Sequence, residues 1–125
     1  MEKKKVLIVD DDEVFVEAIS AVLETRYRTE TAANGAAALE KVKQSPPDVI
    51  VLDVMMDHVT EGFCVARTLK RNPRTQDIPI IMLTGVDRVY NIRMEVDGSW
   101  VPCDKYLEKP VSPEDLLDHV ANLIG

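Results

Sequence analysis

The stretch VLIVDDDEVF, Val6 to Phe15, joins four consecutive aliphatic residues directly to three consecutive acidic residues. The short β-branched run is typical of a strand that is buried on both faces. Like charges side by side at the end of such a strand repel one another, so their presence there needs a reason. Solubility of the surface is one reason, and a site that binds a cation or handles phosphate is the other.

Composition limits the kind of protein that this chain forms. With 125 residues, it has the length of one domain with its own hydrophobic core, and we expect a single domain over residues 1–125. Apolar residues make up 46% and charged residues 30%, the balance of an ordinary globular protein rather than a disordered one. The net charge of −7 disfavours binding to nucleic acid or to an anionic membrane, so neither is an expected partner.

Signals for a membrane or for export are missing from the pattern. The apolar run after the basic start is four residues long, shorter than the core of a signal peptide, and no stretch approaches the roughly 20 apolar residues of a spanning helix. Cys64 and Cys103 have no paired spacing and no histidine at ligand distance, which favours reduced thiols over a disulfide or a metal site. We therefore expect a cytoplasmic protein.

Strand and helix patterns alternate along the chain. Strands are predicted at KKVLIV (4–9), YRTETA (27–32), DVIVLDVMM (48–56), IPIIMLT (78–84) and KYLEKP (105–110). Helices are predicted over 13–25, 36–44 and 61–71, and from Pro113 toward the last residue. The segment 86–103 begins with a helical pattern, VDRVYNIRM, but Gly98, Trp100 and Pro102 indicate an irregular loop.

The first residues of the helices carry capping signals. Asp12 and Ser112 are predicted N-caps, and Asn34-Gly35 is a turn or a cap. The first helix is expected to bury one apolar face, which comprises Val14, Phe15, Ala18, Ile19, Val22 and Leu23. Continuous apolar strands separated by helices predict an α/β fold with a parallel sheet covered on both faces.

Chemically active residues follow the ends of these strands. The first strand ends in Asp10 and Asp11, the third in Asp53, the fourth in Thr84 and the fifth in Lys109. In a doubly wound sheet these ends meet at one crevice. Three carboxylates about 5 Å apart repel by roughly 3 kcal/mol per pair at an effective dielectric of 20. The lysine offsets part of that charge, and an oxygen-liganded divalent cation, Mg²⁺ or Mn²⁺, would balance the rest.

Each of these residues also has a purely structural interpretation. Asp10 and Asp11 can act as capping acids, Thr84 as a turn hydroxyl and Lys109 as a solvated lysine. Asp53 is harder to explain in this way, because a carboxylate inside an aliphatic run is costly to bury without a partner. Their common position at one edge of the sheet favours a functional site.

Four motifs carry a resemblance to a known family. They are VDDD (9–12), VLDVMM (51–56), MLTG (82–85) and YLEKPV (106–111). With these motifs in order, the chain from Lys4 to its end resembles the receiver domain of two-component response regulators. The resemblance implies a flavodoxin-like receiver fold, in which a doubly wound five-stranded parallel sheet of order 2-1-3-4-5 carries helices on both faces.

The resemblance also implies roles for individual residues. Asp53 would be the nucleophile that takes a phosphoryl group from a sensor histidine kinase or a phosphotransfer protein. Asp10 and Asp11 would hold Mg²⁺ together with Asp53 and the backbone carbonyl of Met55. Lys109 would pair with the phosphoryl oxygens. The domain would catalyse only its own phosphorylation and dephosphorylation, and a downstream protein target would recognise the phosphorylated form; a phosphorylation-dependent dimer is a further option.

A switch between two states is implied by the same resemblance. Thr84 would donate its hydroxyl to a phosphoryl oxygen, Gly85 leaves room for the phosphate, and Tyr106 matches the aromatic residue that turns inward when the threonine moves. An ordinary half-buried strand tyrosine is the alternative for Tyr106. The Lys109-Pro110 peptide bond matches one that the family holds in the cis form.

Two segments depart from the family pattern. Residues 56–62, MDHVTEG, lack the usual proline, and Asp57 or His58 could alter access to the site or the rate of hydrolysis. The segment 86–104 is longer than usual, so the signalling face is expected to be built partly on a loop anchored by Trp100.

Three functional interpretations stay open on the sequence alone. A phosphorylatable receiver is the first, and an unphosphorylated pseudo-receiver that serves as a scaffold is the second. A phosphatase-like hydrolase is the third, but that family needs an aspartate two residues after the nucleophile, where this chain has Met55.

Overall fold

The computed structural model describes residues 4–53, 59–84, 105–108 and 112–124. Within these ranges the elements, in chain order, are β1 (Lys5–Val9), α1 (Glu13–Leu23), β2 (Arg28–Ala32), α2 (Gly35–Gln44), β3 (Val49–Asp53), α3 (Val59–Arg71), β4 (Ile80–Thr84), β5 (Lys105–Glu108) and α5 (Pro113–Ile124). The strands and helices predicted for these ranges are confirmed, with small shifts at their ends. The helical pattern at 86–94 and the loop expected after it lie outside the described residues.

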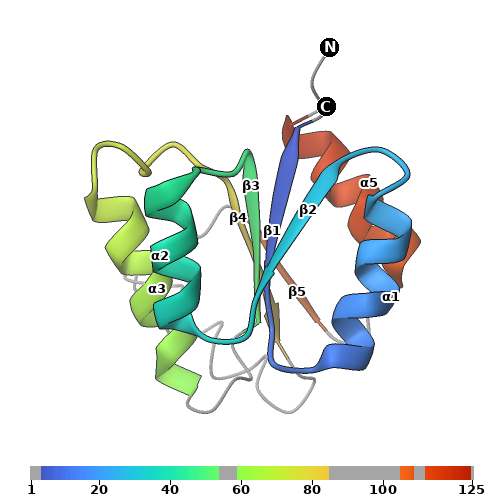
Figure 1. Cartoon of the computed structure of the whole chain (residues 1–125), viewed down its shortest axis with the longest axis horizontal. Coiled ribbons are helices and arrows are strands. Elements are labelled where there is room, and N and C mark those ends of the chain that lie inside the picture. Colours follow the sequence, from blue (N-terminus) through green and yellow to red (C-terminus); the bar gives the residue numbers. More distant parts are fainter. Residues whose placement is uncertain (1–3, 54–58, 85–104, 109–111, 125) are drawn as a thin grey trace.

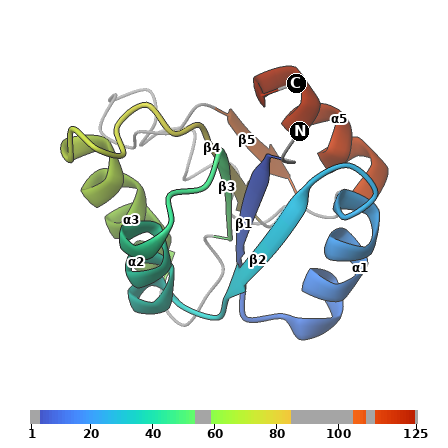
Figure 2. The ribbon, with the colours of Figure 1, turned by 45° about the horizontal axis from the view of Figure 1, so that its top comes forward.

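The strands form one parallel sheet with the order β2-β1-β3-β4-β5, as predicted. Helices α1 and α5 cover one face of this sheet, and α2 and α3 cover the other (Figures 1 and 2). The chain therefore folds as the doubly wound α/β domain that its alternating pattern indicates. None of the helices in the described ranges combines the length and the apolar character that crossing a membrane requires.

The two faces of the sheet bury separate apolar clusters. In β1, Val6 and Ile8 pack on the side of α1 and α5, whereas Leu7 and Val9 pack on the side of α2 and α3. All five residues of β1 are buried, as are all five of β3. Because these central strands contact helices on both faces, their runs Val6–Val9 and Val49–Leu52 are apolar throughout, and the charged residues Lys5 and Asp53 stand at the ends of the two strands.

The edge strand β2 shows the opposite pattern. Its sequence is RTETA, and of these residues Ala32 is the buried one. Arg28 is exposed, and Glu30 is half-buried. This strand has a neighbour on one side, β1, and forms one border of the sheet.

Three of the described helices begin at a side-chain cap. Asp12, Asn34 and Ser112 precede α1, α2 and α5, and each side chain accepts hydrogen bonds from backbone N–H groups two or three residues further on, at 2.8–3.2 Å. These bonds satisfy donors that have no partner inside the helix. The caps predicted at Asp12 and Ser112 are confirmed, and of the two options predicted for Asn34-Gly35 the structure shows the cap.

The predicted buried face of α1 is partly wrong. Ile19 and Leu23 are fully buried, but Val14 is 77% exposed and Ala18 is also exposed. Val16 packs against the core in their place. At 100° per residue, Val14 lies roughly 140° around the helix from Ile19, so it cannot face the sheet when Ile19 does.

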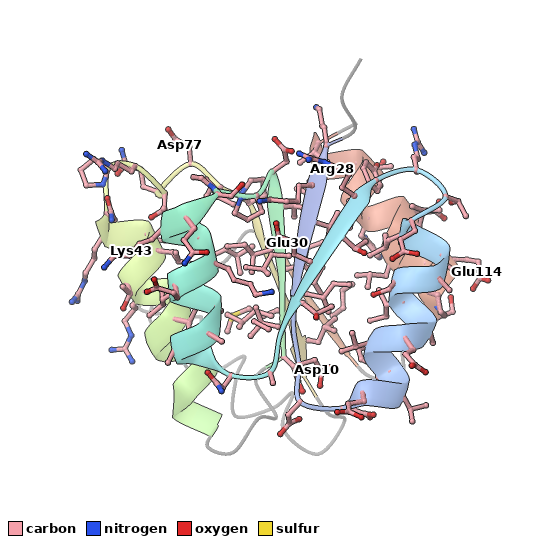
Figure 3. All side chains as sticks on the ribbon, in the orientation of Figure 1. Asp10, Arg28, Glu30, Lys43, Asp77 and Glu114 are labelled. Carbon is pink, nitrogen blue, oxygen red and sulfur yellow. The ribbon has the colours of Figure 1, made fainter. Side chains whose placement is uncertain are left out.

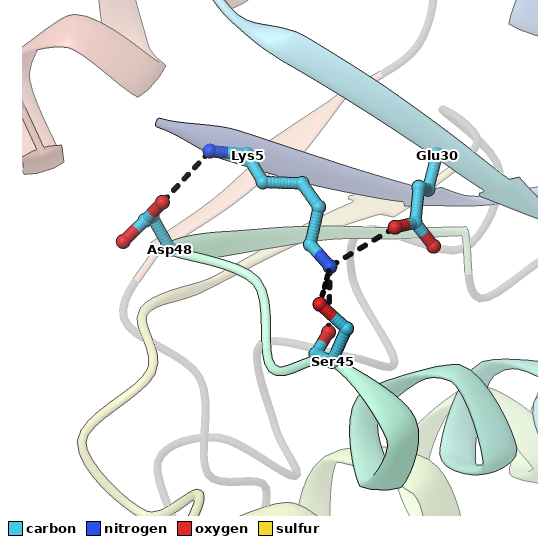
Figure 4. Close-up of polar contacts among 4 residues, drawn as sticks. All are labelled: Lys5, Glu30, Ser45 and Asp48. Atoms are coloured by element: carbon cyan, nitrogen blue, oxygen red, sulfur yellow. Dashed lines mark hydrogen bonds and ion pairs between the residues drawn. The ribbon is translucent and has the colours of Figure 1, made fainter. Parts of the chain in front are cut away.

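A buried lysine ties the start of β1 to its surroundings. Lys5 is 5% exposed, and its Nζ donates to Glu30 at 3.0 Å and to the carbonyl oxygen and Oγ of Ser45 at 2.7 and 2.6 Å (Figure 4). Its backbone N–H donates to the Asp48 carboxylate at 2.7 Å. The ammonium group thus joins β1 to β2 and to the residue that follows α2.

The Lys5–Glu30 pair should respond unequally to the loss of either partner. The Lys5 side chain is 6% exposed and the Glu30 side chain 37%, so Glu30→Gln leaves an ammonium buried without its counter-charge, whereas Lys5→Met leaves a carboxylate that reaches water. We expect Glu30→Gln to lower the free energy of unfolding by about 2 kcal/mol and Lys5→Met by less than about 1 kcal/mol. Urea denaturation measures both.

The matched control for this comparison is Glu17→Gln, at an exposed position of α1. It should change the free energy of unfolding by less than about 0.5 kcal/mol. An equal or larger loss for Lys5→Met than for Glu30→Gln would contradict the argument.

Candidate functional site

Three carboxylates meet at the carboxyl edge of the sheet. Asp10, Asp11 and Asp53 each offer one carboxylate oxygen, and these oxygens all lie within 4.8 Å of one another. Asp10 and Asp53 are buried, at 4% and 2% exposure, and Asp11 is exposed. The structure therefore brings these three residues together as the sequence predicts.

Strand pairing explains this convergence. β1 and β3 are neighbours, and Val9 pairs with Leu52. Asp10 directly follows Val9 and Asp53 directly follows Leu52, so the two acids come to the same edge of the sheet. After β1 the chain crosses to α1 on one face, and after β3 it crosses to α3 on the other face. A parallel sheet leaves a ligand crevice where its connections diverge in this way. Figure 3 shows Asp10 at this edge, at the opposite end of the sheet from Arg28.

Asp10 is held by the backbone around it. Its Oδ1 accepts a hydrogen bond from the N–H of Asp12 at 2.9 Å, and its own N–H donates to the carbonyl of Ala32 at 3.0 Å. Asp12 in turn caps α1. The three consecutive acids therefore have different tasks: Asp12 starts a helix, Asp10 braces that start and joins the cluster, and Asp11 completes the cluster from the exposed side.

The charge of the cluster favours a cation. At separations near 5 Å and an effective dielectric of 20, each pair of ionised carboxylates repels by about 3 kcal/mol. A divalent ion among the three oxygens turns this repulsion into attraction, and Mg²⁺ and Mn²⁺ prefer oxygen ligands. The residues present fit such an ion, so the cluster can hold a metal.

A small pocket beside the cluster was not predicted. It has a volume of about 290 Å³, and its lining includes Asp11, Glu13, Glu17 and Thr31. Glu13 and Glu17 are exposed and lie one helical turn apart at the start of α1, a spacing that the sequence does show. The approach to Asp11 is therefore more acidic than the three aspartates alone suggest.

The other predicted site residues are placed in part or not at all. Thr84 is the last residue of β4 and pairs with Glu108 of β5, while Tyr106 pairs with Met82. The side chains of Thr84 and Tyr106 lie outside the described part. The following predicted residues lie outside the described residues altogether: Met55, Asp57, His58, Gly85, Trp100, Cys103, Lys109 and Pro110.

Comparison with known proteins agrees with the resemblance that the motifs indicated. The model of the response regulator receiver domain matches residues 6–121. This chain is 35% identical to the DNA-binding dual master transcriptional regulator RpaA of Synechocystis, over 96% of this chain and 48% of that protein. The identity to the phosphate regulon transcriptional regulatory protein PhoB of Pseudomonas aeruginosa is 40%, over 91% of this chain and 48% of the relative. The chain thus spans about half the length of these relatives.

Solved structures extend the similarity to three dimensions. The chemotaxis response regulator CheY4 of Vibrio cholerae superposes with a TM-score of 0.84 at 33% identity, covering 97% of this chain and 98% of that one. The range that matches the family, residues 6–121, includes β3, β1 from Val6 onward, and all three aspartates of the cluster. This chain belongs to the response regulator receiver domain family.

Proposed function

We propose that this receiver takes a phosphoryl group onto Asp53 in a Mg²⁺-dependent reaction and that the phosphorylated form changes a surface that a downstream protein recognises. The observation that carries the proposal is the cluster of Asp10, Asp11 and Asp53, with oxygens within 4.8 Å, in a chain of the receiver family. The phosphoryl donor would be a sensor histidine kinase or a phosphotransfer protein, the partners that receivers have in two-component systems.

The proposed reaction is a simple displacement at phosphorus. A carboxylate oxygen of Asp53 attacks the phosphorus of a phosphohistidine, an oxygen–phosphorus bond forms and the nitrogen–phosphorus bond breaks. The bonding electrons stay with the departing imidazole, which takes up a proton. Such transfers depend on positioning and on charge neutralisation more than on acid–base catalysis.

Each residue of the site has a defined task in this scheme. Asp10 and Asp11 would be metal ligands with Asp53 and the Met55 carbonyl, and Lys109 would pair with the phosphoryl oxygens. A bound Mg²⁺ supplies the charge neutralisation between the carboxylates and the incoming phosphoryl oxygens. The bracing of Asp10 by the Asp12 N–H supports this role, because it fixes one ligand before any ion arrives.

The conformational response would begin at Thr84. Its hydroxyl would bind a phosphoryl oxygen, and Tyr106 would change position in consequence. The pairing of β4 with β5 supports a short route between them, since Tyr106 lies opposite Met82, two residues before Thr84. Phosphorylation would then shift a two-state equilibrium toward the form that the target binds.

The phosphoacceptor assignment predicts a clear result for Asp53→Asn. Incubation with acetyl phosphate and Mg²⁺ should add one phosphoryl group to the unaltered chain and none to the variant, as intact-protein mass spectrometry can show. Asp12→Asn is the matched control, since it is the same chemical change next to the cluster and asparagine keeps the cap of α1. That control should still be phosphorylated.

Two results would refute the assignment. Labelling of Asp53→Asn equal to that of the unaltered chain would place the phosphoryl group elsewhere. A chain that binds Mg²⁺ and takes no phosphoryl group from acetyl phosphate or from a phosphorylated histidine kinase would be the scaffold type of receiver.

The metal assignment makes an opposite pair of predictions for Asp11→Asn. The change removes one ligand, so the affinity for Mg²⁺ measured by calorimetric titration should fall by about tenfold or more. It also removes one of three like charges, so the melting temperature without metal should rise. Asp12→Asn should leave the Mg²⁺ affinity close to its original value, and equal affinities for all three proteins would rule out Asp11 as a ligand.

A further inference from the structure

The two helical layers of the molecule carry opposite charge. The sequences of α2 and α3 have a net charge of +3, whereas those of α1 and α5 have a net charge of −5, in a chain whose net charge is −7. The sheet separates the two layers (Figure 2). The face formed by α2 and α3 is therefore basic on an acidic protein, and it lies away from the strand β5 and the helix α5.

A groove runs between α2 and α3 on this basic face. Its volume is about 560 Å³, and Leu39, Val42 and Leu69 provide its apolar surface, with Ala36 near one end. Val42 and Leu69 are buried, and Leu39 is half-buried. From Ala36 to Lys43 the groove follows about two turns of α2, or roughly 10 Å.

Basic side chains surround the groove. Lys43 and Arg74 line it directly, and Arg67 and Arg71 line an adjoining hollow of about 430 Å³. The two linings share Thr68 and Asn72. Glu40 is the acidic residue in these two linings. In Figure 3, Lys43 of α2 lies on the side where α3 is its neighbour. The combined lining has a net charge of +3, so it complements a negatively charged partner.

Two polar residues of the lining, Asn72 and Thr75, form hydrogen bonds within the protein at the end of α3. The Thr75 hydroxyl, which is buried, donates to the carbonyl of Leu69 at 2.5 Å, and the Asn72 side chain accepts from the N–H of Arg74 at 3.0 Å. These bonds engage the Thr75 hydroxyl and the Asn72 side-chain oxygen within the protein, whereas a small polar ligand needs several polar groups directed at it. An apolar floor with a cationic border suits the insertion of apolar side chains flanked by carboxylates.

We propose that the α2–α3 groove docks an acidic amphipathic helix of a protein partner. Leucine-like side chains of that helix fill the floor formed by Leu39, Val42 and Leu69, and its carboxylates pair with Lys43 and Arg74. This surface is additional to the phosphorylation site and does not depend on the proposed chemistry of Asp53.

Two other occupants fit less well. A membrane surface takes up protruding apolar side chains, and among the described residues the large apolar side chain that protrudes is Val14, in the opposite layer. A second copy of the chain offers acidic helices, but among the described residues the large apolar side chain that they expose is Val14, and one side chain cannot fill the groove. Leu23 of α1 and Leu116 of α5 are buried in their own core.

A synthetic peptide provides the probe. It is a fluorescein-labelled helix of about 15 residues with leucines at i, i+4 and i+7 and glutamates on both sides of that stripe. Fluorescence anisotropy with the full chain should show saturable binding that weakens as salt is raised. The double variant Lys43→Glu/Arg74→Glu should weaken binding by about tenfold or more.

The matched control is Lys41→Glu. Lys41 lies in the same last turn of α2 as Lys43 but outside the groove lining, so its reversal changes the net charge and the helix end as the single change Lys43→Glu does. It should change the peptide affinity by less than about twofold. Asp53→Asn should bind the peptide as the unaltered chain does, which separates this test from that of phosphorylation.

Several outcomes would overturn the proposal. They are an absence of saturable peptide binding, equal binding of a peptide with the same composition in scrambled order, and equal losses for Lys41→Glu and the double variant. If the chain binds phosphatidylglycerol vesicles and only the double variant loses that binding, the face is a membrane-binding surface instead. If the chain self-associates in sedimentation experiments and only the double variant loses that association, the groove binds a second copy of the chain.

Discussion

The pairing of β1 with β3 is the constraint on which the rest of this structure depends. It sets Val9 beside Leu52 and so brings Asp10 beside Asp53. A slip of one residue would turn every side chain of a strand to the other face of the sheet and separate the two acids. The apolar residues on both faces of β1 and β3 resist that slip, because each of them already has its own buried position.

This constraint joins stability to chemistry. The two strands are central because Val6–Val9 and Val49–Leu52 are apolar on both faces, and a central position puts the ends of the strands at the crevice between diverging connections. Repulsion among the three carboxylates opposes folding, and the burial of apolar side chains on both faces of the sheet outweighs it. The core therefore holds a charged cluster in place that would not gather by itself.

Much of the fold could be predicted from local patterns. The runs at Val6–Val9 and Val49–Leu52 predict buried strands, and Asp12, Asn34 and Ser112 predict helix starts, because each signal acts over a few residues. The meeting of Asp10, Asp11 and Asp53 also followed from the sequence, once the strands were taken as parallel, since parallel strands end at the same edge.

Other features depend on distances that no local pattern contains. The error at Val14 arose because periodicity identifies a stripe of apolar residues but leaves open which part of it meets the sheet. The buried Lys5 was missed because its partners Glu30 and Ser45 are 25 and 40 residues away. The acidic pocket at Glu17 depends on how α1 lies against the end of β2, and the α2–α3 groove depends on how far these two helices lie from each other.

The polar character of β2 has a consequence for the molecule at high concentration. A border strand exposes backbone donors and acceptors that can pair with another chain, and flat apolar borders start cross-β aggregates. In β2, Arg28 and Glu30 alternate with threonines, so an approaching strand would have to desolvate charged groups to align with it. The charges of this border therefore oppose fibril-like stacking of the chain, even though the strands behind it are among the most apolar segments of the sequence.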